Sequence, residues 1–394
     1  MRKLTRRALC SGAALWPIGT LFASANGPRP LKDIARERGI LFGSAIDYPD
    51  AAVLNNPEAS ALYERECAVF VPGYQLLWSQ NEAVPNSFSF VRADNFAAFA
   101  AATKTKVEGG HVISDAFTPS WANDVFARGG SGKAEALLQR HVAEVVGHFR
   151  GRFASWTVVN ECLDVQGNGR NGLKSVPLYE SLGPASLDIA FNAAHAADPD
   201  AELTLNEVDL EMPFPNNARK RANMLRLIEG MKARNVPIHA LGLQSHLRSQ
   251  YGFDATQVRQ FIAEVAGLGL KIRITELDVD DRSYPTNFEV RDVACARLVK
   301  DYLDVALENK SVDVVITWGL IDKYSWLNLP SQPIPTMDQY DVRNLRQDRT
   351  KHRPLLYDDD LQPKPMREAI ASALAASPNR YAGRGAAIAP ARED

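Results

Sequence analysis

The sequence predicts a single-domain α/β protein folded as a (β/α)8 TIM barrel. Short apolar segments rich in β-branched residues recur along the chain, and segments with helical periodicity separate them. The strand segments are apolar throughout instead of alternating, which is typical of parallel strands covered by helices. Eight such repeats over about 350 residues fit a barrel. An open doubly wound sheet is the alternative, but no glycine-rich phosphate loop follows the first predicted strand.

The predicted elements follow one another in the order that a barrel requires. The expected strands are Leu41–Ile46, Ala68–Trp78, Lys106–Ser114, Phe153–Glu161, Glu202–Asn206, His239–His246, Lys271–Asp278 and Val314–Gly319. Between them, apolar residues recur at helical spacing in several segments. Helices are expected in Leu137–Arg150, Val258–Leu268 and Val293–Leu307.

Polar side chains gather where five of the predicted strands end. They are Asn160 and Glu161, Asn206 and Glu207, Gln244 and His246, Glu276 and Asp278, and Trp318 with Asp322. Active sites of (β/α)8 barrels lie at the carboxyl ends of the strands. Residues with purely structural roles would be scattered over both ends, so this pattern predicts an active site at one rim.

Glu161 and Glu276 form the most informative pair of residues. An acid at the end of a buried strand is costly unless it is solvated, paired or used chemically. Either glutamate alone would more often be a salt-bridge partner, but two at one rim suggest the carboxylate pair that breaks a glycosidic bond. In a retaining enzyme the carboxyl groups lie about 5–5.5 Å apart. One attacks the anomeric carbon and the other donates a proton to the leaving oxygen.

Neighbouring residues fit the handling of a sugar. Asn160 is suited to bind a sugar hydroxyl beside the reacting carbon, and Gln244 and His246 are suited to orient the nucleophile. His246 could instead be an ordinary histidine at a strand end. Trp318, Trp326 and Trp78 offer flat apolar faces for sugar rings, although a single tryptophan is more often a core residue.

Several separated motifs resemble those of glycoside hydrolase family 10, the xylanase family of retaining β-glycanases. Trp156–Glu161 resembles the strand that carries the family's acid/base residue, and Ile274–Asp278 resembles the strand of its nucleophile. Further similar segments are Asn206-Glu207, Gly242–His246, Trp318–Leu327, Pro354–Asp358 and Pro363–Pro365. The resemblance spans residues 31–376.

The resemblance implies a polysaccharide hydrolase that needs no cofactor or metal. It implies that Glu161 is the acid/base and Glu276 the nucleophile. The substrate-binding residues expected on this basis are Asn160, Gln244, His246, Trp318, Trp326, Trp78, His111 and Asn206.

Two strands depart from the family pattern. The second strand of the family usually carries Glu-Asn-x-Met-Lys-Trp, but Gly73–Trp78 keeps only the tryptophan. The third usually reads Arg-Gly-His-x-Leu-x-Trp-His, whereas Gly109–Asp115 lacks the Trp-His pair. We therefore expect a xylan-related substrate that is branched or of bacterial origin. Gly73, Gly109 and Gly110 would leave space for a branch.

Two alternatives accompany this expectation. In the first, Tyr74, Gln75 and Asp115 replace the missing contacts and the substrate is unchanged. In the second, the protein binds or processes polysaccharide on the same fold with little or no turnover. Retention of both glutamates argues against the second alternative, because a pure binder does not need an acid pair.

The N-terminus predicts export. Arg6 and Arg7 precede an apolar segment that ends at Ala23-Ser24-Ala25, which is typical of a twin-arginine signal peptide over residues 1–25. Cleavage there would remove four positive charges and change the formal net charge from −2 to −6. We expect a periplasmic or secreted monomer that does not bind nucleic acid and has no membrane span.

The remaining features are less specific. Cys67, Cys162 and Cys295 would allow at most one disulfide bond, and no Cys/His cluster has metal-binding spacing. The segment Leu327–Arg353 is expected to be a long loop that faces either the substrate or solvent. Residues 377–394 are rich in alanine, glycine and proline and are expected to be disordered.

Overall fold

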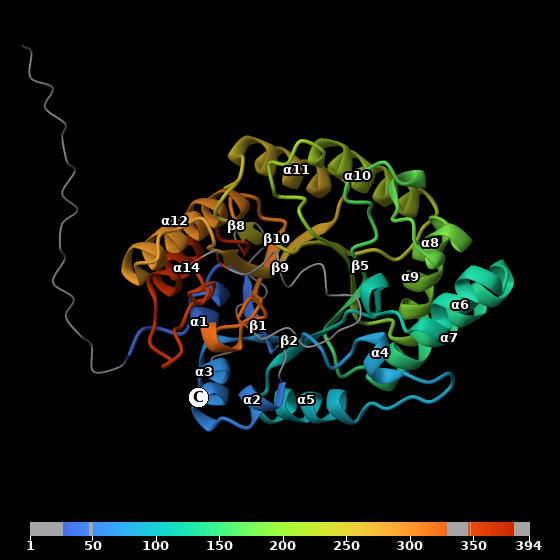
Figure 1. The fold of residues 1–394 in the computed structure, drawn as a ribbon, viewed down its shortest axis with the longest axis horizontal. Helices are drawn as coiled ribbons and strands as arrows, with labels where there is room; N and C mark the ends of the chain where they lie inside the picture. Colours follow the sequence, from blue (N-terminus) through green and yellow to red (C-terminus); the bar gives the residue numbers. More distant parts are fainter. Residues whose placement is uncertain (1–26, 47–49, 329–345, 347, 382–394) are drawn as a thin grey trace, which may run out of the picture.

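Parallel strands close into a barrel with helices on the outside (Figure 1). The computed structural model describes residues 27–46, 50–328, 346 and 348–381. Strand β10 pairs with both β9 and β1, which closes the ring, and β4 and β8 extend β3 and β7 toward the rim. The strands are β1 Leu41–Ile46, β2 Val69–Pro72, β3 Lys106–Gly109, β4 Ile113–Ser114, β5 Ser155–Asn160, β6 Glu202–Glu207, β7 Ala240–Leu243, β8 His246–Arg248, β9 Lys271–Asp280 and β10 Val312–Thr317. The predicted single-domain (β/α)8 barrel is confirmed.

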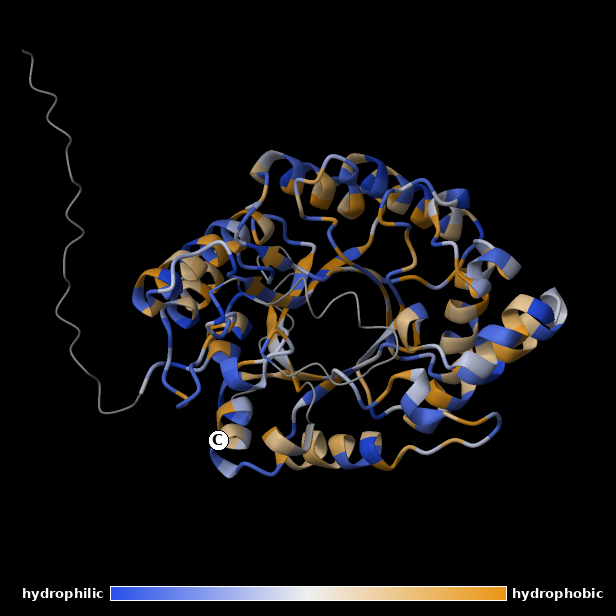
Figure 2. Cartoon of the chain, in the orientation of Figure 1, coloured by the Kyte–Doolittle hydropathy of each residue, from blue (hydrophilic) through white to orange (hydrophobic). Residues whose placement is uncertain are grey.

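The helices surround the barrel, and their apolar faces turn toward the strands (Figure 2). The α-helices are α1 Leu31–Arg36, α2 Asp50–Leu54, α3 Pro57–Glu66, α4 Trp78–Asn81, α5 Val91–Ala102, α6 Ser120–Arg128, α7 Ser131–His148, α8 Pro177–Leu182, α9 Ala185–Ala197, α10 Asn217–Ala233, α11 Ala255–Gly267, α12 Phe288–Ala306 and α14 Pro365–Ala376. Short 3-10 turns are η1 Asp115–Phe117, η2 Arg170–Gly172 and η3 Asp322–Tyr324. The three helices predicted from periodicity correspond to α7, α11 and α12, with ends shifted by a few residues.

Three predicted strands are shorter or broken. The second ends at Pro72 instead of Trp78, and Trp78 begins α4. The third breaks after Gly109, where β3 ends, and resumes as β4. The sixth breaks at Ser245, whose φ of 64° is left-handed and cannot continue a strand.

Several glycines occupy positions where atoms of a neighbouring strand lie too close for a larger residue. A Cβ at Gly43 would lie 2.1 Å from the Val69 carbonyl oxygen on the neighbouring strand β2. A Cβ at Gly109 would lie 2.5 Å from the Trp156 ring, and one at Gly110 would lie 2.8 Å from Cβ of Thr157. The prediction that Gly109 and Gly110 leave space for a sugar branch is therefore wrong, because β5 side chains already fill that space.

Both ends of the sequence carry predictions that lie partly outside the described residues. The predicted signal peptide, residues 1–25, lies wholly outside them. Of the predicted disordered tail, residues 377–381 are described, and the Arg380 guanidinium donates to the Val312 carbonyl at 2.6 Å. The expectation of disorder is wrong for these five residues, since they pack on the barrel.

Most of the predicted loop Leu327–Arg353 also lies outside the described residues. Its described residue Arg346 is buried and donates to the carbonyl of Tyr284 at 2.8 Å and to Oδ1 of Asp281 at 3.2 Å. Arg346 therefore belongs neither to a solvated surface nor to a sugar-facing one.

The described residues include three cysteines and all the helices that could be compared with a membrane span. Cys67, Cys162 and Cys295 are all buried and unpaired, so none of them forms the disulfide bond that their number would permit. No helix in the described ranges is both long and apolar enough to cross a membrane.

Candidate active site

Glu276 lies on β9 and is surrounded by nitrogen atoms. The amide of Asn206 on β6 donates to its Oε1 at 2.6 Å. Nε2 of His111 lies 3.3 Å from the same oxygen, and Nε2 of His246 lies 3.3 Å from Oε2. Burial raises the pKa of this carboxyl, but the two histidines outweigh it and bring the pKa down to about 2. Glu276 is therefore ionised at any ordinary pH.

His246 is held in turn by a second carboxylate. Its Nδ1 lies 2.8 Å from Oδ1 of Asp278, and Nε1 of Trp326 donates to Oδ2 of Asp278 at 2.7 Å. Burial lowers the pKa of His246, but Asp278 and Glu276 raise it well above its usual value. When His246 is protonated, both ring nitrogens donate, which fixes the ring between the two carboxylates.

Glu161 follows directly after β5 in a strained backbone conformation. Its φ is 55°, a left-handed value that costs a residue other than glycine on the order of 1 kcal/mol. Its amide donates to the Asn206 carbonyl at 3.0 Å, which anchors the turn to β6. The side chain is about a quarter exposed (26%), whereas that of Glu276 is almost covered (5%).

The two glutamates are linked by a chain of buried amides. Gln244 donates from one nitrogen to Oε1 of Glu161 at 2.8 Å and to Oδ1 of Asn160 at 3.1 Å. Asn206 donates to the same Asn160 oxygen at 2.9 Å and also to Glu276. The strands therefore bring Glu161 and Glu276 into one hydrogen-bonded network.

A lysine that the sequence reasoning missed contacts Glu161. Nζ of Lys174, from the loop between β5 and α8, lies 3.5 Å from Oε2 of Glu161 and 2.8 Å from Oδ1 of Asp115. Burial raises the pKa of Glu161, but Lys174 and the Gln244 amide outweigh burial, so the net pKa is lowered. The only available signal in the sequence was Asp115 itself, a carboxylate where the family has an aromatic residue.

The predicted sugar-binding residues differ in what surrounds them. Trp318 stacks on His111 with ring centroids 5.9 Å apart, and Trp326 meets His246 edge-on at 5.5 Å, so both tryptophans border the histidines around Glu276. Asn206 is fully buried (0%) between Asn160 and Glu276. It has no surface left for a sugar, which corrects its predicted role to one of positioning.

Trp78 is a core residue, contrary to its predicted role as a sugar platform. It is 1% exposed, and its ring stacks on His141 with centroids 3.6 Å apart. Its Nε1 donates to Glu82 at 3.2 Å. Because the strand ends at Pro72, Trp78 begins α4 and lies beneath the helices instead of at the rim.

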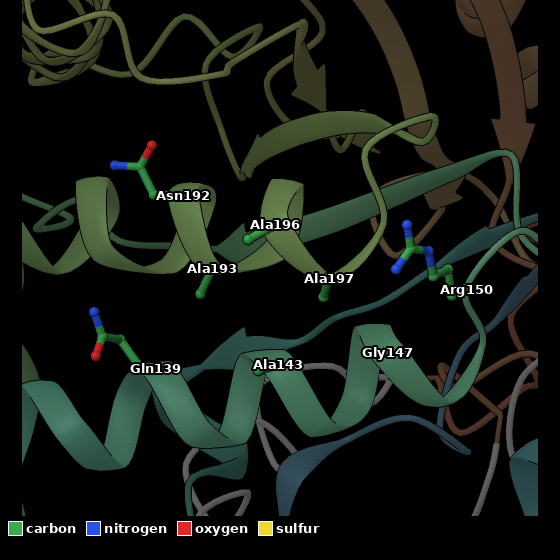
Figure 3. A pocket seen from close by; sticks show the side chains of 8 residues that line it. All are labelled: Gln139, Ala143, Gly147, Arg150, Asn192, Ala193, Ala196 and Ala197. Atoms are coloured by element: carbon green, nitrogen blue, oxygen red, sulfur yellow. The ribbon is translucent and has the colours of Figure 1, made fainter.

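A groove on the outside of the barrel lies apart from this network. It measures about 580 Å³ between α7 and α9 and is lined by four alanines and Gly147, with Gln139 and Asn192 toward one end and Arg150 toward the other (Figure 3). It contains no carboxylate or imidazole. Among the described residues, no group of three or more histidine, cysteine, aspartate or glutamate side chains could hold a metal ion.

The fold and the rim residues define a class of protein that sequence comparison identifies. The sequence profile of glycosyl hydrolase family 10 matches residues 30–373. The chain belongs to this family and is a glycoside hydrolase.

Individual relatives carry more specific names. A β-1,4-xylanase of Dictyoglomus thermophilum is 30% identical over 342 residues, covering 85% of this chain and 88% of that protein. Endo-1,4-beta-xylanase 5 of Pyricularia oryzae is 29% identical over 374 residues, covering 90% of this chain and 80% of the relative. The crystal structure of native xylanase 10B from Thermotoga maritima superposes with a TM-score of 0.74 at 26% identity, covering 88% of this chain and 98% of that one.

Proposed function

We propose that this protein is an endo-acting β-1,4-glycan hydrolase, xylanase-like, that cleaves a xylan-related polysaccharide with retention of configuration. The observation that carries the proposal is the ionised Glu276 carboxylate, held by Asn206, His111 and His246 in one network with Glu161. Relatives named xylanases support the polysaccharide class. A mutant of the xylanase TsXylA from Thermoanaerobacterium saccharolyticum, 26% identical and with a TM-score of 0.72, was solved with xylotriose.

The proposed reaction is a double displacement. The Glu276 carboxylate attacks the anomeric carbon while Glu161 donates its proton to the glycosidic oxygen, which leaves with the bonding electron pair. A glycosyl ester on Glu276 results. Glu161, now ionised, takes a proton from water while the water oxygen attacks the anomeric carbon, and the bond from that carbon to Glu276 breaks, which releases the sugar and restores the Glu276 carboxylate.

Two variants test the assignment of roles. Glu276→Ala should abolish the glycosyl-enzyme on every substrate, because no nucleophile remains. Glu161→Ala should lose most activity on natural glycans but keep the first step on aryl glycosides whose leaving groups need no proton. Identical behaviour of the two variants on aryl glycosides would refute the roles. Proton NMR of the first product should show retention, the outcome expected of two carboxyl groups that lie about 5–5.5 Å apart.

The finer substrate proposal concerns the second and third strands. Leu77 stands where the family has lysine and is 2% exposed, so no cation from this position reaches a sugar. Asp115 replaces the family's tryptophan and is paired with Lys174. We therefore propose poor turnover of linear xylan relative to a branched or otherwise substituted glycan. Comparable kcat/KM on unbranched xylo-oligosaccharides and on the best glycan of a broad screen would refute this.

Export is part of the same proposal, supported by the signal-like pattern of residues 1–25. Fusion of this segment to a reporter that works only outside the cytoplasm tests it. The alternative predicted from the sequence, a protein that binds or processes glycan with little or no turnover, is not favoured, because the chain belongs to a family of glycoside hydrolases. It is supported only if purified protein binds xylo-oligosaccharides and releases no sugar from any glycan or aryl glycoside.

A further inference from the structure

A cation sits against the proposed proton donor. Glu161 must carry a proton before the leaving oxygen can accept one. Nζ of Lys174, 3.5 Å from Glu161, favours the opposite state, in which Glu161 is ionised. The arrangement of charges without substrate is therefore suited to the second step of the reaction but opposes the first.

The position of Lys174 is fixed by its main chain. The amide of Lys174 donates to the Cys162 carbonyl at 2.9 Å, directly beside Glu161. Leu163 and Leu173 form an antiparallel bridge in the same loop. The side chain is about a fifth exposed (19%), as is that of Asp115 (20%), so the ion pair borders solvent at the rim. A polar group of the substrate can reach it.

Lys174, Asp115 and Glu161 form one ion cluster, in which a single ammonium group faces two carboxyl groups. Lys174 contacts both Asp115, on η1, and Glu161, after β5. Other charged groups act on Glu161 from the surrounding elements. They are Glu276 on β9, His111 after β3, and the Glu207–Lys220 pair between β6 and α10.

A third carboxylate at this cluster would reverse the balance. Carboxylates crowded around one site cannot all stay ionised, and one of them takes up a proton. Asp115 is held to Lys174 at 2.8 Å and Glu161 at 3.5 Å, so an added carboxylate would displace the weaker contact, that of Glu161. The added carboxylate would accept the ammonium hydrogen that now faces Glu161.

We propose that Lys174 binds the carboxylate of an acidic sugar, a uronic acid branch or residue next to the cleaved bond, and that this carboxylate makes Glu161 take up the proton it donates. This inference rests on the proposed glycosidase function and names the substrate class. The proton comes from solvent water or buffer. It passes from Glu161 to the glycosidic oxygen as the carbon–oxygen bond breaks and Glu276 bonds to the anomeric carbon. An acidic glycan thus favours the protonated form of Glu161 that cleaves it, and a neutral glycan does not.

The test uses two matched oligosaccharides and one activated substrate. The pair is a xylo-oligosaccharide with a single glucuronic acid branch and its carboxyl-reduced counterpart, which differ only in charge. The third probe is an aryl β-xylobioside whose leaving group needs no proton. For the natural chain near pH 6, kcat/KM should be about tenfold or more higher for the acidic probe than for the reduced one, the equivalent of one pKa unit at Glu161.

Substitutions within the cluster should shift the pH profile in opposite directions. In Lys174→Met the alkaline limb of kcat/KM on the reduced probe should move up by about one pH unit, and the preference for the acidic probe should disappear. In Asp115→Asn the same limb should move to lower pH, because the Lys174 ammonium then stabilises the charge of Glu161 alone. Lys174→Arg keeps the charge and should keep the preference. Lys300→Met, which removes a lysine–aspartate pair on α12, is the matched control and should change nothing.

The outcomes separate this inference from the proposed function. Aryl glycoside turnover with equal rates on the two oligosaccharides would overturn the role of Lys174 and leave the glycosidase intact. Shifts of the limb in the same direction in Lys174→Met and Asp115→Asn would also overturn it. Lack of turnover on all three probes would refute the glycosidase itself. If Lys174→Met does not fold by circular dichroism, Asp115→Asn and Lys174→Arg decide. Acidic plant xylan and acidic bacterial polysaccharide, assayed in parallel, identify the source of the uronate.

Discussion

Replacement of Asn206 by alanine tests whether the buried amide network prepares Glu276 for attack. The side chain donates to Glu276 at 2.6 Å and to Asn160 at 2.9 Å, and accepts from the Thr275 hydroxyl at 2.7 Å. Hydrogen bonds to charged groups contribute about 1.5–3 kcal/mol each. If the bond to Glu276 matters as much in the transition state, kcat/KM should fall by about tenfold to a hundredfold.

The pH profile of the Asn206→Ala enzyme gives an independent readout. The folded pKa of Glu276 is depressed to about 2, so its ionised form is present above that pH and is lost as the pH falls through it. Loss of a donor to the ionised form raises the pKa. The acid limb of kcat/KM should therefore move to higher pH, and aryl glycosides should show the loss as clearly as natural glycans.

A second buried asparagine separates catalysis from stability. Asn223 on α10 is 2% exposed and donates to the Gly167 carbonyl at 3.1 Å, without a bond to either glutamate. Asn223→Ala should lower the free energy of unfolding by about 1–3 kcal/mol while keeping kcat/KM and the acid limb. The reasoning is refuted if Asn206→Ala loses only stability, or if both variants lose activity to the same extent.

Three further predictions concern the core and the chain end. Trp78→Ala should lower the free energy of unfolding by about 3–5 kcal/mol in denaturant titration; a raised KM with unchanged stability would instead restore the sugar-platform role. Arg380→Ala should cost about 1–2 kcal/mol through its bonds to the barrel backbone, and an unchanged midpoint would contradict the packing of residues 377–381. The thiols of Cys67, Cys162 and Cys295 are buried, and burial raises the pKa of each. A thiol reagent should label them only on unfolding, so rapid labelling of the native protein would show that the sites open.

The barrel and the positions of Glu161, Glu276 and His246 along it could be predicted from the amino-acid sequence alone. Strand and helix periodicities are local properties, and parallel strands in a closed barrel must end at one rim. A polar residue that ends a buried strand is therefore placed by its position in the sequence alone. The same logic located Asn206 at the rim, but it could not tell that the amide would be fully covered and would bind Glu276 instead of a sugar.

The contacts that come from loops and from side-chain packing could be seen only in the folded protein. Lys174 meets Glu161 because the loop after β5 folds back on Cys162, a path that no periodicity encodes. Trp78 turned inward because the strand stopped at Pro72, and the third-strand glycines proved to be close-packed because β5 side chains fill the space beside them. The physical reason is common to all three cases. Burial and ionisation depend on atoms distant in sequence, whereas propensity and periodicity report only on neighbours.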